Sequence, residues 1–79
     1  MSVLAKRRFV TNIQEVRKER GMTQQEVGQG FRKPVDITMI SRWERGVVRP
    51  TATNLLELAR VLKINPAKLH FVEDRQDSL

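Results

Sequence analysis

The stretch from residue 23 to residue 46, TQQEVGQGFRKPVDITMISRWERG, constrains the fold of this chain more than any other part. Thr23 and Glu26 have the spacing of a capping box, in which each side chain accepts a hydrogen bond from the backbone N–H of the other residue. Asp36 offers a second N-cap, and Gly46 favours a helix end. The stretch therefore predicts two short helices joined by a turn.

Composition limits what surrounds these helices. A chain of 79 residues supports one domain, and with only 39% apolar residues its core has to be compact. The lack of cysteine excludes a disulfide framework and a thiolate metal site, which suits a reducing cytosol. No apolar run approaches the ~18 residues of a membrane span. The basic N-terminus is not followed by an apolar segment, so we expect no signal peptide.

The charge is unevenly distributed. The formal net charge is +6, but the last seven residues, EDRQDSL, carry three acids and one base. Residues 1–72 therefore hold fourteen bases and six acids, a net charge of +8. Such an excess fits binding to a polyanion, although charge alone leaves an ordinary solvated surface equally open. We expect one domain over residues 1–72 and a flexible acidic tail over residues 73–79.

Helical spacing of apolar residues recurs along the chain, and no alternating strand pattern is visible. The fold class expected is therefore all-α, a compact domain of five helices. The start of the first helix is open, because a cap at Thr11 would leave residues 1–10 as a basic arm. The helices expected run from 4 or 9 to 20, from 24 to 30, from 37 to 45, from the cap Thr51 through Leu62, and from Asn65 to 70 or 71.

Several spaced motifs occur together. The strings GMTQQEV, ISRWERG and RPTATNLLELARVLKINPAKL follow one another in the sequence. They resemble the XRE family of phage-repressor and Cro-like helix-turn-helix proteins, over about residues 12 to 70. The resemblance implies a regulator of transcription that binds double-stranded DNA as a homodimer on a palindromic operator, and we expect a repressor. The elements that carry it are Arg17, Thr23-Gln24, Ile40-Ser41, Glu44-x-Gly46-x-x-x-Pro50, and Leu58-Ala59 with Leu62.

The chain departs from the family pattern in the turn. FRKPVDI holds about two more residues than the family's tight glycine turn, and Pro34 disfavours helix at Lys33. The angle of the following helix is left open by this insertion. The insertion also places Arg32 and Lys33 near the helix that follows. There they either reach DNA phosphate or are solvated loop charges. Lys63 stands where glycine often ends a helix, which predicts mild strain there.

The helix from residue 37 to 45 determines what would be read on DNA. With Asp36 as cap, four side chains project outward, while Ile40 and Trp43 turn towards the core. Arginine pairs with guanine O6 and N7, and an apolar group can meet a thymine methyl, whereas hydroxyls can bond to base edges or phosphate. The alternative is that these are plain surface residues. The base-reading candidates are Ile37, Thr38, Ser41 and Arg42.

Other residues would position the protein on the DNA backbone. By resemblance, Gln24 contacts phosphate at a helix start that also favours an anion. Arg45, Arg49 and Thr51 follow the reading helix, and we expect phosphate contacts there, with a solvated loop as the alternative. The resemblance also implies a structural ion pair between Arg17 and Glu44.

The dimer surface is less constrained. Leu69, Phe71 and Val72 leave more apolar surface than a short terminal helix needs, so they either form a dimer interface or close the core of one subunit.

We find no catalytic constellation, cofactor fingerprint or small-molecule site, and we expect a protein that is not an enzyme and binds no metal. His70 has no partner at metal-ligand spacing. A competing hypothesis is a protein-interaction module of the same fold, an antitoxin or coactivator-like adaptor with non-specific DNA affinity. Contact of residues 3–13 with an anionic membrane is a weaker idea. The hypothesis of a DNA-binding regulator fits a cytoplasmic protein of bacterial or phage origin.

Overall fold

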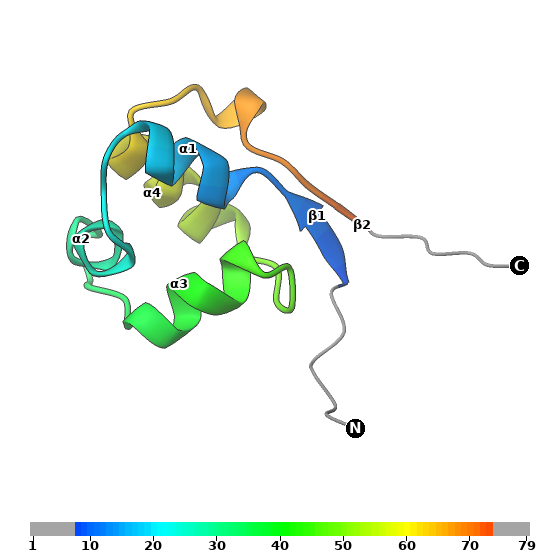
Figure 1. Ribbon diagram of the computed structural model, residues 1–79, viewed down its shortest axis with the longest axis horizontal. Coiled ribbons are helices and arrows are strands. Elements are labelled where there is room, and N and C mark those ends of the chain that lie inside the picture. Colours follow the sequence, from blue (N-terminus) through cyan, green and yellow to red (C-terminus); the bar gives the residue numbers. More distant parts are fainter. Residues whose placement is uncertain (1–7, 74–79) are drawn as a thin grey trace, which may run out of the picture.

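Helices surround a single core, and a small sheet closes one side of it (Figure 1). The computed structural model describes residues 8–73. Within that range none of the helices has the length and apolar character needed to cross a membrane. In chain order the elements are β1 (Phe9–Thr11), α1 (Ile13–Glu19), α2 (Gln24–Gln29), α3 (Ile37–Glu44), α4 (Ala52–Leu62), the 3-10 turn η1 (Pro66–Lys68) and β2 (Phe71–Glu73).

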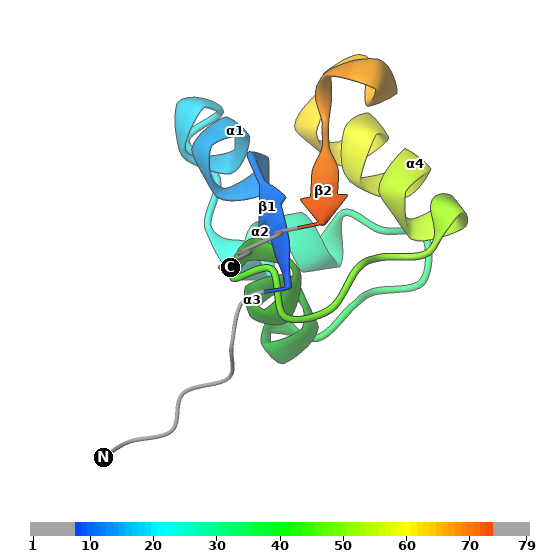
Figure 2. The same cartoon turned by 90° about the vertical axis from the view of Figure 1, so that its right-hand side faces the viewer.

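The prediction of an all-α fold with five helices is wrong at both ends of the described range. The first helix begins only at Ile13, and the expected fifth helix is the three-residue turn η1. Instead, β1 and β2 pair antiparallel, with Val10 opposite Val72 (Figure 2). The partners are some sixty residues apart, so no local pattern announces the pairing. Residues 1–7 of the expected basic arm and 74–79 of the expected tail lie outside the described residues, and Glu73 belongs to β2.

Hydrogen bonds explain why the chain is extended before α1. The N–H groups of Arg8 and Phe9 both donate to the carbonyl of Gly46, at 2.8 and 3.0 Å. The amide of Asn12 donates to the Lys68 carbonyl at 2.8 Å and accepts the His70 N–H at 3.1 Å. Backbone groups that a helix would satisfy internally are thus satisfied by distant segments. These bonds align the chain around β1 with the end of α3 and with β2.

The starts of α2, α3 and α4 follow the sequence closely. The Glu26 N–H donates to Thr23 Oγ1 (3.0 Å) and the Thr23 N–H to Glu26 Oε1 (2.8 Å), which confirms the capping box. Asp36 and Thr51 cap α3 and α4 through their side chains, as expected. Lys63 ends α4 with a φ of 56°, in the left-handed region that favours glycine, so the predicted strain at this residue is confirmed.

Among residues 8–73, eleven buried apolar residues form the core. Trp43 is 2% exposed and stacks on Phe31, with ring centroids 5.9 Å apart. Leu69 and Phe71, at 5% and 7% exposed, close this core from the C-terminal side. The full set is Ile13, Val16, Val27, Phe31, Ile40, Trp43, Leu58, Ala59, Leu62, Leu69 and Phe71.

The long turn between α2 and α3 folds back onto Gly28. The Val35 N–H donates to the Gly28 carbonyl at 3.0 Å. A Cβ atom on Gly28 would lie 2.2 Å from the carbonyl oxygen of Val35, far inside van der Waals contact. Glycine is therefore required at this helix position because the turn backbone occupies the space of a side chain.

We expect Gly28→Ala to lower the free energy of unfolding by about 1–3 kcal/mol, since the new methyl group displaces backbone and this outweighs the better helix propensity of alanine. Gly30→Ala is the matched control, because its Cβ would press on the side chain of Val61, at 2.9 Å, and would only touch the Val27 carbonyl oxygen, at 3.4 Å. Urea denaturation of both variants gives the two losses. An equal or larger loss in Gly30→Ala contradicts the explanation.

Candidate nucleic-acid interface

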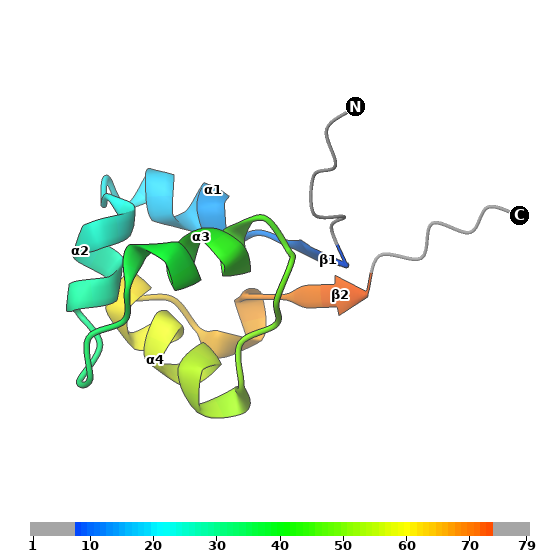
Figure 3. The same cartoon turned by 90° about the horizontal axis from the view of Figure 1, so that it is seen from below.

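One face of α3 lies on the outside of the molecule. In Figure 1 the helix runs along the lower edge, and Figure 3 shows it from below, next to α4. Ile40 is fully buried and Trp43 nearly so, whereas Ile37 is 47% exposed. Thr38 and Arg42 are exposed and Ser41 is half-buried. The four base-reading candidates therefore lie on the side of α3 that does not pack against the core.

The start of α3 is fixed by Asp36. Its carboxylate accepts the Thr38 N–H at 2.8 Å, and this hydrogen bond lowers the pKa of Asp36 below its usual value. A negative charge at a helix N-terminus is also favoured by the helix dipole. At the other end, the chain leaves the helix at Gly46, which has a φ of 73°. Both ends of α3 are thus defined by residues that the sequence singles out.

A buried ion pair holds the last turn of α3. Arg17 Nε donates to Glu44 Oε2, and Arg17 Nη2 donates to Glu44 Oε1 at 3.2 Å. Arg17 Nη1 also donates to the Met22 carbonyl at 2.9 Å. The Glu44 side chain is only 2% exposed and that of Arg17 11%. This two-pronged contact joins α1 to α3, which is the geometry that a guanidinium suits.

Gln24 belongs to the same cluster. Its side-chain amide donates to Glu44 Oε1 at 2.9 Å, so the amide nitrogen is engaged inside the protein. The second N–H of this nitrogen and the backbone N–H groups at the start of α2 are the donors left for a phosphate, since the amide oxygen can only accept hydrogen bonds. A phosphate role for Gln24 therefore has to share the side chain with a structural one.

The predicted phosphate residues differ in their surroundings. Arg32 is held by Glu57 of α4 through an ion pair. Arg45 lies beside the exposed side of α3, since its Nε donates to Ser41 Oγ at 3.2 Å. Thr51 Oγ1 accepts the Asn54 N–H as the α4 cap. Lys33 and Arg49 are exposed.

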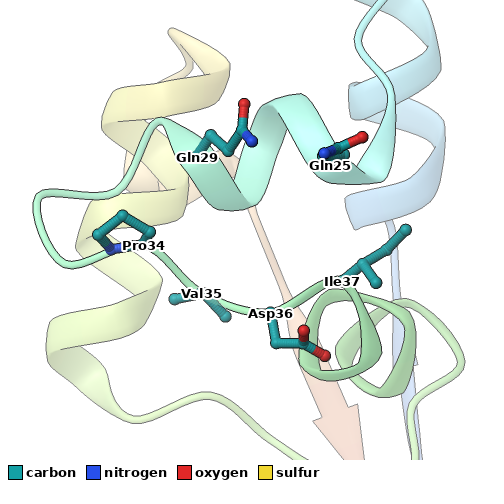
Figure 4. A pocket seen from close by; sticks show the side chains of 6 residues that line it. All are labelled: Gln25, Gln29, Pro34, Val35, Asp36 and Ile37. Carbon is teal, nitrogen blue, oxygen red and sulfur yellow. The ribbon is translucent and has the colours of Figure 1, made fainter.

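Sequence reasoning missed Gln25. Together with Ile37 it borders an open hollow between α2 and the start of α3, which Figure 4 shows from close by. Gln25 and Gln29 stand four residues apart on one helix face, and both are exposed. A glutamine amide can bond to adenine N6 and N7. A signal for Gln25 is present in the sequence. Two glutamines stand at helical spacing on a helix in which Val27 is the apolar residue needed in the core.

The three predicted dimer residues do not share one surface. Leu69 and Phe71 are buried in the core, whereas Val72 is 57% exposed. Val10, its partner across the sheet, is 39% exposed. The outward face of the sheet therefore presents a valine pair.

These features define a small basic domain with a helix-turn-helix whose second helix faces outward. Residues 13–69 match the family model described as Helix-turn-helix, and the chain belongs to this family, the XRE type expected from the motifs. Membership indicates a DNA-binding regulator of transcription, in a family that is not enzymatic. Searches of curated proteins and of solved structures gave no match.

We expect Glu44→Ala to cost about 3–5 kcal/mol of stability, because it leaves the guanidinium of Arg17 without its buried partner. The preference of the folded protein for one DNA sequence over another should change less than its stability does. Chemical denaturation measures the stability, and competition binding measures the sequence preference. Glu19→Ala, which removes an exposed acid, is the control. Unchanged stability with relaxed sequence preference would assign Glu44 to DNA reading instead.

Proposed function

We propose that the protein is a sequence-specific transcriptional repressor that binds a palindromic operator in double-stranded DNA as a homodimer. The observation that carries this proposal is the outward face of α3, which presents hydroxyl, apolar and guanidinium groups on a basic domain of the helix-turn-helix family. An α-helix of this kind fits the major groove, where each base pair has its own pattern of donors and acceptors.

The reading residues would divide the work by chemistry. Arg42 would make a bidentate contact with guanine, and Ile37 would pack on a thymine methyl. Thr38 and Ser41 would bond to base edges or nearby phosphate. Ile37 at 47% exposure supports this, because the core gains little from it and an apolar contact on DNA would cover it.

Phosphate contacts would set the position of the domain. We assign them to Lys33 in the turn, to Arg45 and Arg49 after α3, and to the starts of α2 and α4 at Gln24 and Thr51. Arg32 is a weaker candidate because its guanidinium is bound to Glu57. If a dimer makes about eight such contacts, log affinity should fall with log salt concentration with a slope of about −7.

Selection from random DNA sequences tests the function directly. A homodimer should select an inverted repeat with half-sites about 34 Å apart, one turn of the duplex. Salt-sensitive binding without any preferred sequence would overturn the proposal and favour a protein-interaction module with non-specific DNA affinity. Reporter expression with the selected site at a promoter then distinguishes repression from activation.

Two arginines should behave differently on the selected site. Arg42→Ala should lose about 1–3 kcal/mol at one guanine position and relax the preference there. Arg49→Ala removes the same charge but should weaken binding to all sequences alike and flatten the salt slope of the dimer by about two units, one for each subunit. Titrations against a set of single-base-pair variants give both profiles. The same uniform loss in both variants would remove Arg42 from the reading residues.

We propose that the dimer contact lies on the sheet and is made by Val72 and Val10. Leu69 and Phe71 are buried in the core and are not part of it. The sheet lies beside the C-terminal end of α3 (Figure 3), and Gly46 accepts hydrogen bonds from the residues that lead into β1. A second copy docked on this side would bring both α3 helices to the same side of the dimer, as a palindrome requires.

Val72→Lys should therefore weaken dimerisation by about tenfold or more, because a two-fold axis brings the two introduced ammonium groups together. Leu56→Lys on α4 is the control, since Leu56 is similarly exposed at 59% and lies outside the sheet. Sedimentation equilibrium measures the association, and circular dichroism verifies the fold. A dimer that survives Val72→Lys unchanged rejects this interface.

A further inference from the structure

The long turn between α2 and α3 is fastened to α4 by one carboxylate. Glu57 Oε1 accepts the backbone N–H of Arg32 at 3.0 Å, and Glu57 Oε2 binds the Arg32 guanidinium. Arg60, one helical turn further along α4, donates to Glu57 Oε1 at 2.8 Å and to the Gly30 carbonyl at 2.7 Å. A carboxylate and a guanidinium of α4 thus hold both the end of α2 and the first residues of the turn.

The Glu57 group is sheltered and stays charged. Its side chain is 13% exposed, between two arginines that are themselves more open to solvent. Hydrogen bonds from Arg60 and from the Arg32 N–H lower the pKa of Glu57 to about 2. The carboxylate is therefore ionised throughout the physiological pH range, and this contact does not act as a pH switch.

The far end of the turn has its own anchor. Val35 donates to Gly28 and lies so close to it that no side chain fits between them. Asp36, the next residue, caps α3. Only Lys33 and Pro34 stand between the two anchored positions. Without these anchors, a turn of this length would leave the N-terminal end of α3 free to vary in direction. Glu44 holds only the C-terminal end of the helix.

We propose that Glu57 is a positioning residue for sequence recognition: by binding the extended turn, it sets the direction in which the first turn of α3 enters the DNA groove. The inference rests on the proposed DNA-reading function of α3. It also gives Arg32 a structural role, since its charge is directed to α4. Base contacts tolerate little misplacement, so a loosened turn should cost discrimination before it costs overall affinity.

The test uses Glu57→Gln and Arg60→Gln in the full chain. For each we compare affinity for the selected operator with affinity for an operator altered at the base pairs that face the start of α3. Both variants should lose discrimination on the order of tenfold, about what one well-aligned base contact supplies. Glu57→Gln raises the net charge and Arg60→Gln lowers it. A loss of discrimination that both variants share therefore cannot come from the change in charge. Glu19→Gln, which changes an exposed acid of α1, is the control and should leave the ratio unchanged.

Thermal melting and the exchange rate of the Arg32 amide proton accompany these titrations. Faster exchange at Arg32 with lost discrimination supports the proposal. Affinity that falls by one factor on both DNA sequences, in step with the melting temperature, would show that Glu57 only stabilises the fold and would overturn it. If the wild-type protein itself shows no sequence preference, the proposed function fails first, and the wild-type titration alone reveals this.

Discussion

The carboxylate of Glu44 is almost completely withdrawn from water, and three helices meet on it. Arg17 reaches it from α1 with two nitrogen atoms, and Gln24 reaches it from α2. A buried charge of this kind is tolerable only when its oxygens are fully hydrogen-bonded, so each of these contacts requires the others. The angle between α2 and α3 follows from that requirement, and with it the exposure of the four side chains that would read DNA. The same carboxylate therefore connects the stability of the domain with the orientation of its reading helix.

The longer turn changes how this arrangement is completed. In a tight turn the backbone itself limits the placement of the second helix, whereas the seven residues 30–36 between α2 and α3 leave freedom that other contacts have to remove. Here Gly28 supplies the space for the returning backbone, and Glu57 supplies a charged anchor from α4. The glycine looks like a weak helix residue in isolation, but it is a consequence of the turn length. Glu44 and Glu57 thus act on opposite ends of α3, one from inside the core and one from its edge.

Much of this structure can be predicted from local sequence, because helix starts are local events. Thr23, Asp36 and Thr51 each bind an N–H within three residues, and the apolar spacing around Ile40 and Leu58 places the core. The sheet could not be predicted in that way. Three residues make too short a pattern, and β1 is extended because β2 and Gly46 are present to bind it. The exposure of Val72 beside the burial of Phe71 follows from this pairing. Likewise, the contact of Glu57 with the turn depends on tertiary packing.

The distribution of charge also reads differently once the contacts are known. Arg17, Arg32 and Arg60 bind carboxylates, and Arg20 donates to the Leu62 carbonyl at the end of α4. These guanidinium groups hold the domain together, so the number of bases overstates how many are free to meet a polyanion. In the described part of the chain, Lys33, Arg42, Arg45 and Arg49 form no ion pair with a described acid, and all four lie in or after the turn that leads into α3. Among the described bases, Arg8, Lys18, Arg20, Lys63 and Lys68 likewise form no such ion pair, so unpaired positive charge is found on other faces as well as around α3. The four around α3 would attract DNA to the face that carries the proposed base-reading residues.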